Sequence, residues 1–223
     1  MVKFIDDHLN NIKEKVSKMW SLVYEQIEKS HTAVLKMDDT LAKQILTGEK
    51  RVNAFELEID SDIEDFIALY TPVAIDLRFA LAMLNINNNL ERIGDYAEGI
   101  ARFILRCEDC KIDKKLLDEL KIDEMFRLVL EMLALTHNAL LEEDSNRAKG
   151  VFAKDDRIDE LNTDSLRILS DYAGNHPESA RMCIELSGVF RKLERAGDHI
   201  NNLAEETIFY IDANILKHHK KPM

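Results

Sequence analysis

The residues with the clearest chemical potential are acidic pairs spaced four apart, which recur in the two halves of the chain. The segment LERIGD at residues 90–95 returns as LERAGD at residues 193–198, with five of six positions identical. Each copy carries a Glu and an Asp at i and i+4, and a helix places such residues on one face about one turn apart. Carboxylates grouped in this way are candidate ligands for hard cations.

A second acidic pair precedes each LERxGD segment on what should be the neighbouring helix. Glu56 and Asp60 form it in the first half, and Asp155 and Asp159 form it in the second half, 99 residues later. Each pair frames an Ile three residues after its first member. Each half of the chain therefore contains two acidic pairs on two successive helices.

The spacing of the two halves predicts a change of length within this second helix. Asp38 matches Asp144 at an offset of 106 residues, whereas the acidic pairs match at an offset of 99. We therefore expect seven residues to have been gained or lost there. Seven residues make about two helical turns, so the acidic face would keep its direction.

If the two pairs of one half face each other, four carboxylates converge. At an effective dielectric constant near 20 and ~5 Å spacing, each like-charge pair costs on the order of 3 kcal/mol. Raised pKa values or bound cations would relieve this repulsion, and Fe, Mn, Zn, Mg and Ca all accept carboxylate ligands. Gly94 and Gly197, at matching mid-helix places, cost about 1 kcal/mol each relative to Ala. We therefore expect another group to approach the backbone at these glycines.

The elements that must position these residues are long amphipathic helices. The chain has only 7 Gly and 3 Pro in 223 residues, which leaves few turns. Helical spacing of apolar residues predicts six helices, with Pro72 and Pro177 in the first turns of the third and sixth. The apolar residues of the first two helices run over 9–27 and 41–63, with a break and helix-cap residues at 37–40 between them. The later helices are expected over 72–105, 116–141, 144–174, where residues 144–146 offer caps, and from 177 to the basic tail. We expect an all-α fold of two tandem three-helix bundles related by an internal repeat, with domains at residues 1–109 and 110–223.

Composition excludes several classes of function. The formal net charge of −12 has the wrong sign for a protein that holds nucleic-acid phosphates. Three Cys and no apolar run after a basic start argue against a secreted disulfide scaffold, so we expect a cytoplasmic protein. The most apolar stretch, residues 67–86, contains two charged side chains, which makes a bilayer span unfavourable. The chain also shows no nucleophile–base pair or glycine-rich phosphate loop, so we expect it not to be an enzyme.

The paired LERxGD segments, the sequence Asp76-Leu77-Arg78 after Pro72, and Gly197-Asp198-His199 resemble the motifs of the PhoU family, which comprises accessory proteins of bacterial phosphate-specific transport. The resemblance implies tandem three-helix bundles that bind multinuclear metal clusters, iron among them, through ExxxD-type pairs. It also implies a negative regulator of the phosphate-starvation response, with a sensor histidine kinase and the ATPase of a phosphate transporter as partners. We expect a homodimer as the binding unit, because amphipathic bundles often leave an apolar strip that can pair. Carried over to this sequence, the metal ligands are Glu56, Asp60, Glu91 and Asp95 in the first half and Asp155, Asp159, Glu194 and Asp198 in the second.

Two other functions are compatible with the same residues. A ferritin-like di-iron oxidase or storage protein also uses acid-lined helices, but it needs two Glu-x-x-His motifs, and this chain offers only Glu28 and His31. A helical interaction module without metal would leave the carboxylates solvated. Cys107 and Cys110 have CxxC spacing without a second Cys pair, so a structural role is expected. His199 is expected to be an ordinary surface histidine.

Overall fold

The computed structural model describes residues 2–73, 75–107 and 112–212, and every regular element within them is helical. Six of these helices have at least 21 residues. Two short α-helices and one 3₁₀-helix connect them. The helices are α1 (Val2–Lys36), α2 (Asp39–Tyr70), α3 (Ile75–Arg106), α4 (Lys114–Glu119), α5 (Ile122–Glu142), α6 (Ser145–Lys149), α7 (Phe152–Asn175), η1 (Pro177–Ser179) and α8 (Ala180–Asp212).

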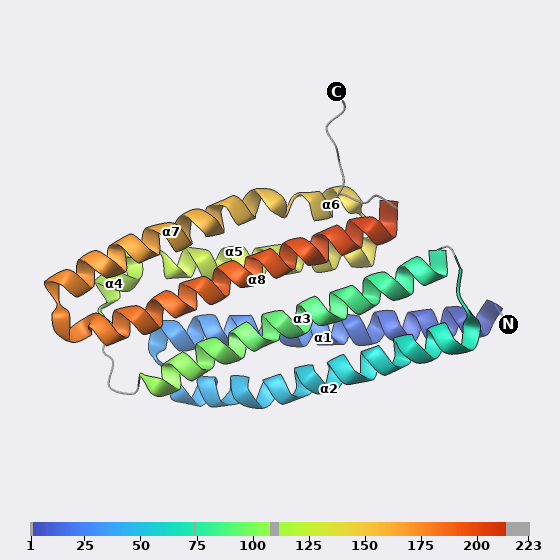
Figure 1. The fold of residues 1–223 in the computed structure, drawn as a ribbon, viewed down its shortest axis with the longest axis horizontal. Coiled ribbons are helices and arrows are strands. Elements are labelled where there is room, and N and C mark those ends of the chain that lie inside the picture. Colours follow the sequence, from blue (N-terminus) through green and yellow to red (C-terminus); the bar gives the residue numbers. More distant parts are fainter. Residues whose placement is uncertain (1, 74, 108–111, 213–223) are drawn as a thin grey trace, which may run out of the picture.

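The long helices form two antiparallel three-helix bundles that lie side by side (Figure 1). Helices α1, α2 and α3 pack on one another, and α5, α7 and α8 form the second bundle. The bundles join where α8 runs along α3 and where α5 contacts α1. The predicted all-α fold of two tandem three-helix bundles is thus confirmed.

Aspartate side chains cap the starts of two of the helices. The Asp38 side chain accepts hydrogen bonds from the backbone N–H groups of Thr40 and Leu41 at the start of α2. Asp144 does the same at the start of α6, accepting from two backbone N–H groups. The residue before each cap, Met37 or Glu143, has a left-handed backbone with φ of 49° or 54°. The two helical hairpins are therefore built alike at an offset of 106 residues.

Three predicted helix boundaries are wrong. Helix α3 begins at Ile75 rather than Pro72, because Thr71 ends α2 in a left-handed conformation and residues 71–73 complete the turn. The helix expected over 116–141 breaks at Lys121, where φ is 53° and the chain changes from α4 to α5. The fifth helix is likewise divided, since α6 ends at Lys149 and α7 starts at Phe152.

Other predictions fall outside the described residues. These are the boundary between residues 109 and 110, the Cys110 half of the CxxC motif and the basic tail. The described helices include none that is both long and apolar enough to cross a membrane.

The contact between the bundles has an approximate two-fold symmetry. His31 of α1 stacks on Phe126 of α5, with ring centroids 4.9 Å apart. His137 of α5 stacks on Trp20 of α1 at 5.0 Å. Each member of the first stack matches a member of the second at an offset of 106 residues. The two repeats therefore face each other as the two subunits of a symmetric dimer would.

Candidate functional site

Three of the four carboxylates predicted for the first half come close together. Glu56 lies on α2, and Glu91 and Asp95 lie on α3. Burial raises the pKa of Glu91, and the negative charges of Asp95 and Glu56 raise it further. Burial, followed by the charge of Asp60, also raises the pKa of Glu56. Like charges thus meet across the α2–α3 contact.

Asp60 is held at the edge of this group by a buried asparagine. The Asn87 side-chain amide of α3 donates to Asp60 Oδ1 at 2.8 Å and to the Glu56 carbonyl oxygen at 2.9 Å. Asn87 lies one turn before Glu91 on α3. This anchor directs Asp60 toward Asn87.

The most unusual carboxylate of the first bundle is one that the sequence patterns did not indicate, Glu49. It is only 3% exposed, and neither carboxylate oxygen has a hydrogen-bond partner among the described residues. Burial raises its pKa to about 8, with further contributions from the charges of Asp95, Glu98 and Glu91. Glu49 therefore reaches the α2–α3 acidic cluster from inside the bundle, and it is the carboxylate most in need of a proton or a cation.

Gly94 makes room for Glu49. A Cβ atom at position 94 would lie 2.9 Å from Glu49 Oε2 and 3.1 Å from Val52 Cγ1. The matching Gly197 makes room for Asp155, whose Oδ1 would lie 2.8 Å from such a Cβ. The expected close approach at both glycines is present, and the approaching group is a carboxylate.

The second cluster contains all four predicted residues. Burial raises the pKa of Asp155 to about 6, against a hydrogen bond from Asn201 of α8, and the charges of Asp159 and Asp198 raise it further. Burial, then Asp198 and Asp159, raise the pKa of Glu194. Carboxylates of α7 and α8 thus face one another.

The predicted seven-residue shift within the second helix of each repeat is wrong. Glu49 and Val52 face Gly94, and Asp155 and Ile158 face the equivalent glycine, so the offset stays at 106 throughout α2 and α7. Buried positions agree, since Ala42, Ile45 and Ile63 match Ala148, Val151 and Leu169. In this register Glu49 corresponds to Asp155, and Asn53 corresponds to Asp159. Glu56 and Asp60 lie two turns further along α2.

The glycine contacts give a testable difference between the repeats. Replacing Gly by Ala within a helix gains about 1 kcal/mol of helix propensity. We expect Gly197→Ala to be neutral or stabilising by up to ~1 kcal/mol, because half-buried Asp155 can turn aside. Gly94→Ala should destabilise by ~1–2 kcal/mol, because Val52 and Glu49 are both buried. Urea unfolding measures both free energies, and equal changes would contradict the close packing at Gly94.

Few positive charges neutralise the carboxylates of the acidic clusters. Arg92 approaches Glu91 at 3.6 Å and Asp95 at 3.5 Å, but its side chain is 61% exposed. Such exposed pairs contribute little. Within the described part of the chain, no three His, Cys, Asp or Glu side chains are already arranged as metal ligands. A bound cation would therefore require the carboxylates to change rotamer.

The histidines singled out in the sequence lie in the contact between the bundles. His31 bonds Asp123 at 2.9 Å in the α1–α5 contact, which does not suit the second ligand of a di-iron helix. His199 is half-buried rather than on the surface. Its Nδ1 lies 2.8 Å from Asn89 Oδ1, and its Nε2 lies 3.3 Å from the Tyr96 hydroxyl, between α8 and α3. These contacts place His199 between the two bundles, and burial lowers its pKa. Cys107 is buried at the end of α3.

Comparison with known proteins gives consistent matches over most of the chain. The family model described as the PhoU domain matches twice, over residues 16–104 and 122–207. A homologue of the phosphate-specific transport system accessory protein PhoU from Aquifex aeolicus is 36% identical over 211 residues, covering 94% of each chain. Homolog 1 from Thermotoga maritima is 34% identical over 201 residues, covering 90% of this chain and 86% of its own.

Solved structures show the same arrangement of helices. The crystal structure of PhoU from Pseudomonas aeruginosa superposes with a TM-score of 0.88 at 26% identity, covering 94% of this chain and 99% of that one. The phosphate transport system regulatory protein PhoU from Streptococcus pneumoniae gives a TM-score of 0.82 at 23% identity, a likeness of fold.

Proposed function

This chain belongs to the PhoU family, and we propose that it is a metal-binding regulatory adaptor of phosphate uptake and phosphate-starvation signalling. Family membership supports an accessory, non-enzymatic role in phosphate transport. The adaptor would act by docking on protein partners. Its acidic clusters would supply the metal sites.

The observation that carries the metal proposal is Glu49. A buried carboxylate without hydrogen bonds is stable only when it is protonated or bound to a cation. Its neighbours are further carboxylates, so the donor set suits hard or borderline cations such as Fe, Mn, Zn, Mg or Ca. A cation would neutralise the repulsion that raises the pKa values of Glu49, Glu56 and Glu91. The proposed ligands are the predicted residues Glu56, Asp60, Glu91, Asp95, Asp155, Asp159, Glu194 and Asp198, with Glu49 added.

Paired variants test this assignment by elemental analysis of protein purified without chelator. Glu91→Ala with Asp95→Ala should remove metal from the first cluster only. Glu194→Ala with Asp198→Ala should remove it from the second only. Unchanged metal per chain in both double variants would refute the proposal.

A second pair of variants tests which carboxylates of α2 bind the metal. Because Glu49 is buried against the cluster and Asp60 is anchored to Asn87, Glu49→Gln should weaken metal binding more than Asp60→Asn. The reverse order would assign the first site to the pair predicted from the sequence alone. Aerobic iron oxidation assays on the loaded protein provide the comparison with a di-iron oxidase, and sustained turnover would favour the oxidase.

The proposed partners are a sensor histidine kinase and the ATPase of a phosphate transporter, with a homodimer as the binding unit. Deletion of the gene in phosphate-replete cells should then switch on phosphate-starvation genes, and deletion of the kinase as well should silence them again. Silent starvation genes in the single deletion would refute negative regulation. Direct binding of the purified protein to their promoters would refute regulation through protein partners.

A further inference from the structure

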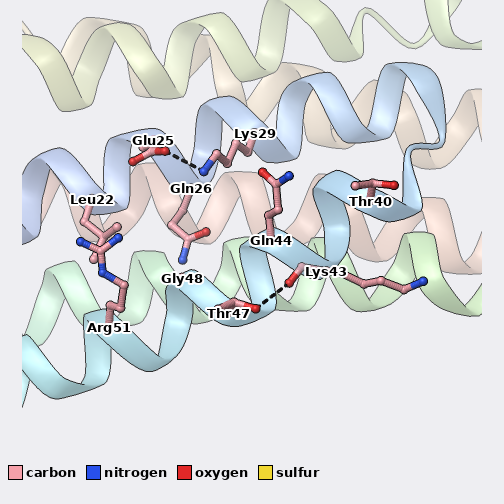
Figure 2. A pocket seen from close by; sticks show the side chains of 10 residues that line it. All are labelled: Leu22, Glu25, Gln26, Lys29, Thr40, Lys43, Gln44, Thr47, Gly48 and Arg51. Atoms are coloured by element: carbon pink, nitrogen blue, oxygen red, sulfur yellow. Dashed lines mark hydrogen bonds and ion pairs between the residues drawn. The ribbon is translucent and has the colours of Figure 1, made fainter.

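A cavity of about 440 Å³ opens between α1 and α2 on the outer side of the first bundle (Figure 2). Its α1 wall carries Glu25, Gln26 and Lys29, and Gly48 and Arg51 lie on its α2 wall. Gln26 is 2% exposed and donates one amide N–H to the Ile45 carbonyl oxygen at 3.2 Å, with its side chain directed at Gly48 (Figure 2). Polar groups of both helices thus line the cavity, and the hydrogen bond to Ile45 holds the Gln26 side chain in place at its base.

The second repeat has the same helices but fills the equivalent space. Gly48 corresponds to Lys154 at the offset of 106 residues, and Lys154 reaches across to Glu131 at 2.7 Å. In the first repeat Glu25, the equivalent of Glu131, pairs with Lys29 on its own helix at 2.6 Å. Gly48 leaves room for the Gln26 side chain, whose Nε2 would lie 2.5 Å from a Cβ at position 48. No side chain from position 48 therefore crosses the gap between α1 and α2 as Lys154 does in the second repeat.

The two repeats also differ in the ion-pair partners of an arginine that occupies equivalent positions in both. Arg157 of α7 is held by Glu124 at 2.8 Å and by Glu160 at 2.7 Å. Its equivalent Arg51 lines the cavity, and none of the ion pairs found among the described residues involves it.

Sequence changes account for this difference. The positions equivalent to the two carboxylate partners of Arg157 are occupied by Lys18 and Ala54. Lys18 places a positive charge where the second repeat has Glu124, and Ala54 has no charge where the second repeat has Glu160. Arg51 therefore keeps its guanidinium available, in a chain whose net charge of −12 would otherwise repel anions.

Further hydrogen-bond donors surround the opening. The ammonium groups of Lys29 and Lys43 come from α1 and α2, and the hydroxyl group of Thr40 lines the α2 side. The Thr47 hydroxyl also lines this side but donates to the Lys43 carbonyl oxygen at 3.1 Å. Figure 2 shows the Arg51 side chain rising beside Leu22 at one end, and the Lys43 side chain extending away from it at the other end. Three cations against the single carboxylate of Glu25 leave an excess of positive charge.

We propose that this pocket binds the phosphoryl group of a small phosphorylated molecule. A guanidinium presents a planar fork that matches phosphate oxygens, and lysine ammonium groups add point charges. The cavity lies within the range typical of small-molecule sites, so it accommodates a group larger than phosphate itself. The proposal does not depend on the metal sites, because Gly48 faces Gln26 of α1 whereas its neighbour Glu49 faces Gly94 of α3.

Titration calorimetry on the full chain in EDTA tests the proposal, since the chelator removes metal-bridged binding at the acidic clusters. The probes are inorganic phosphate, AMP and ATP. At least one should bind with a dissociation constant below about 1 mM, and the affinity should fall as salt is raised. Tighter binding of AMP or ATP than of phosphate identifies a nucleotide-sized ligand, and the reverse identifies the free ion.

Matched variants of the two repeats locate the site. Arg51→Gln should weaken binding about tenfold or more, because it removes the guanidinium that lines the cavity. Arg157→Gln, the equivalent change in the second repeat, should leave the affinity within about twofold. Arg51 is exposed, so Arg51→Gln should keep the helical circular dichroism of the wild type. Failure of all three probes to bind at about 10 mM, or unchanged affinity in Arg51→Gln, would overturn the proposal.

Discussion

The metal-free protein should lose unfolding free energy as the pH rises from about 5 to 8, and Glu49→Gln should remove most of that loss. The pKa of Glu49 is raised from 4.5 to about 8 in the folded state. Between these values the folded chain binds a proton that the unfolded chain does not, so stability falls with increasing pH. Below pH 4.5 both states are protonated and the contribution is complete. At 1.36 kcal/mol per pKa unit the total effect is on the order of 5 kcal/mol.

Urea unfolding of chelator-treated protein at several pH values measures this effect. Glu49→Gln keeps the shape of the side chain and removes its charge, so most of the fall in stability should disappear. The remaining slope comes from the other carboxylates with a raised pKa, which are Asp155, Glu56, Glu91 and Glu194. The matched control is Asp60→Asn, at a half-buried carboxylate that already accepts a hydrogen bond from Asn87, and it should keep the wild-type slope. A wild-type stability independent of pH between 5 and 8 would mean that Glu49 is not buried as described.

Metal removal should have an effect of similar size. A ligand that binds only the folded state adds about 2.7 kcal/mol of stability at 100 times its dissociation constant. For a chain of this length, that corresponds to a rise in Tm of about 5 to 10 °C. Differential scanning calorimetry of metal-loaded and chelated protein measures the difference.

The control for this experiment combines the substitutions at both LERxGD segments. A chain carrying Glu91→Ala, Asp95→Ala, Glu194→Ala and Asp198→Ala should melt at one temperature with and without chelator. It should also melt above the chelated wild type, because the facing carboxylates no longer repel. If the wild-type chain is shown to contain metal but has the same Tm with and without chelator, the clusters do not bind that metal.

Most of the fold could be predicted because helical periodicity and capping act locally. The asparagine- and aspartate-rich turns, the long apolar stripes and the repeated LERxGD segments together indicate the two bundles. The wrong boundaries depend on tertiary contacts. Leu120 and Ile122 are both buried, and the left-handed Lys121 between them lets both reach the core. No local signal in that segment marks such a break.

The metal-ligand candidates on the LERxGD segments could be predicted because the two copies are nearly identical. Those on α2 and α7 were harder to predict because the two repeats share few residues there. The second cluster brings together all four expected carboxylates, and the first brings together three with a fourth at its edge. The sequence pattern does not indicate Glu49, because Asn53 stands where an ExxxD pair would have its Asp. Glu56 and Asp60 form a complete ExxxD pair and were therefore predicted instead. Holding the offset of 106 fixed from Asp38 and Asp144 onward would have identified Glu49, since it then aligns with Asp155.

The paired stacks of His31 on Phe126 and His137 on Trp20 have an evolutionary consequence. In a homodimer every substitution appears on both sides of the symmetry axis, so an improvement on one side must also be tolerated on the other. Fusion of the two halves into one chain removes that constraint. Trp20 and Phe126 already differ at equivalent places, as do Gly48 and Lys154. Each half is thereby free to change at a position that the other half keeps.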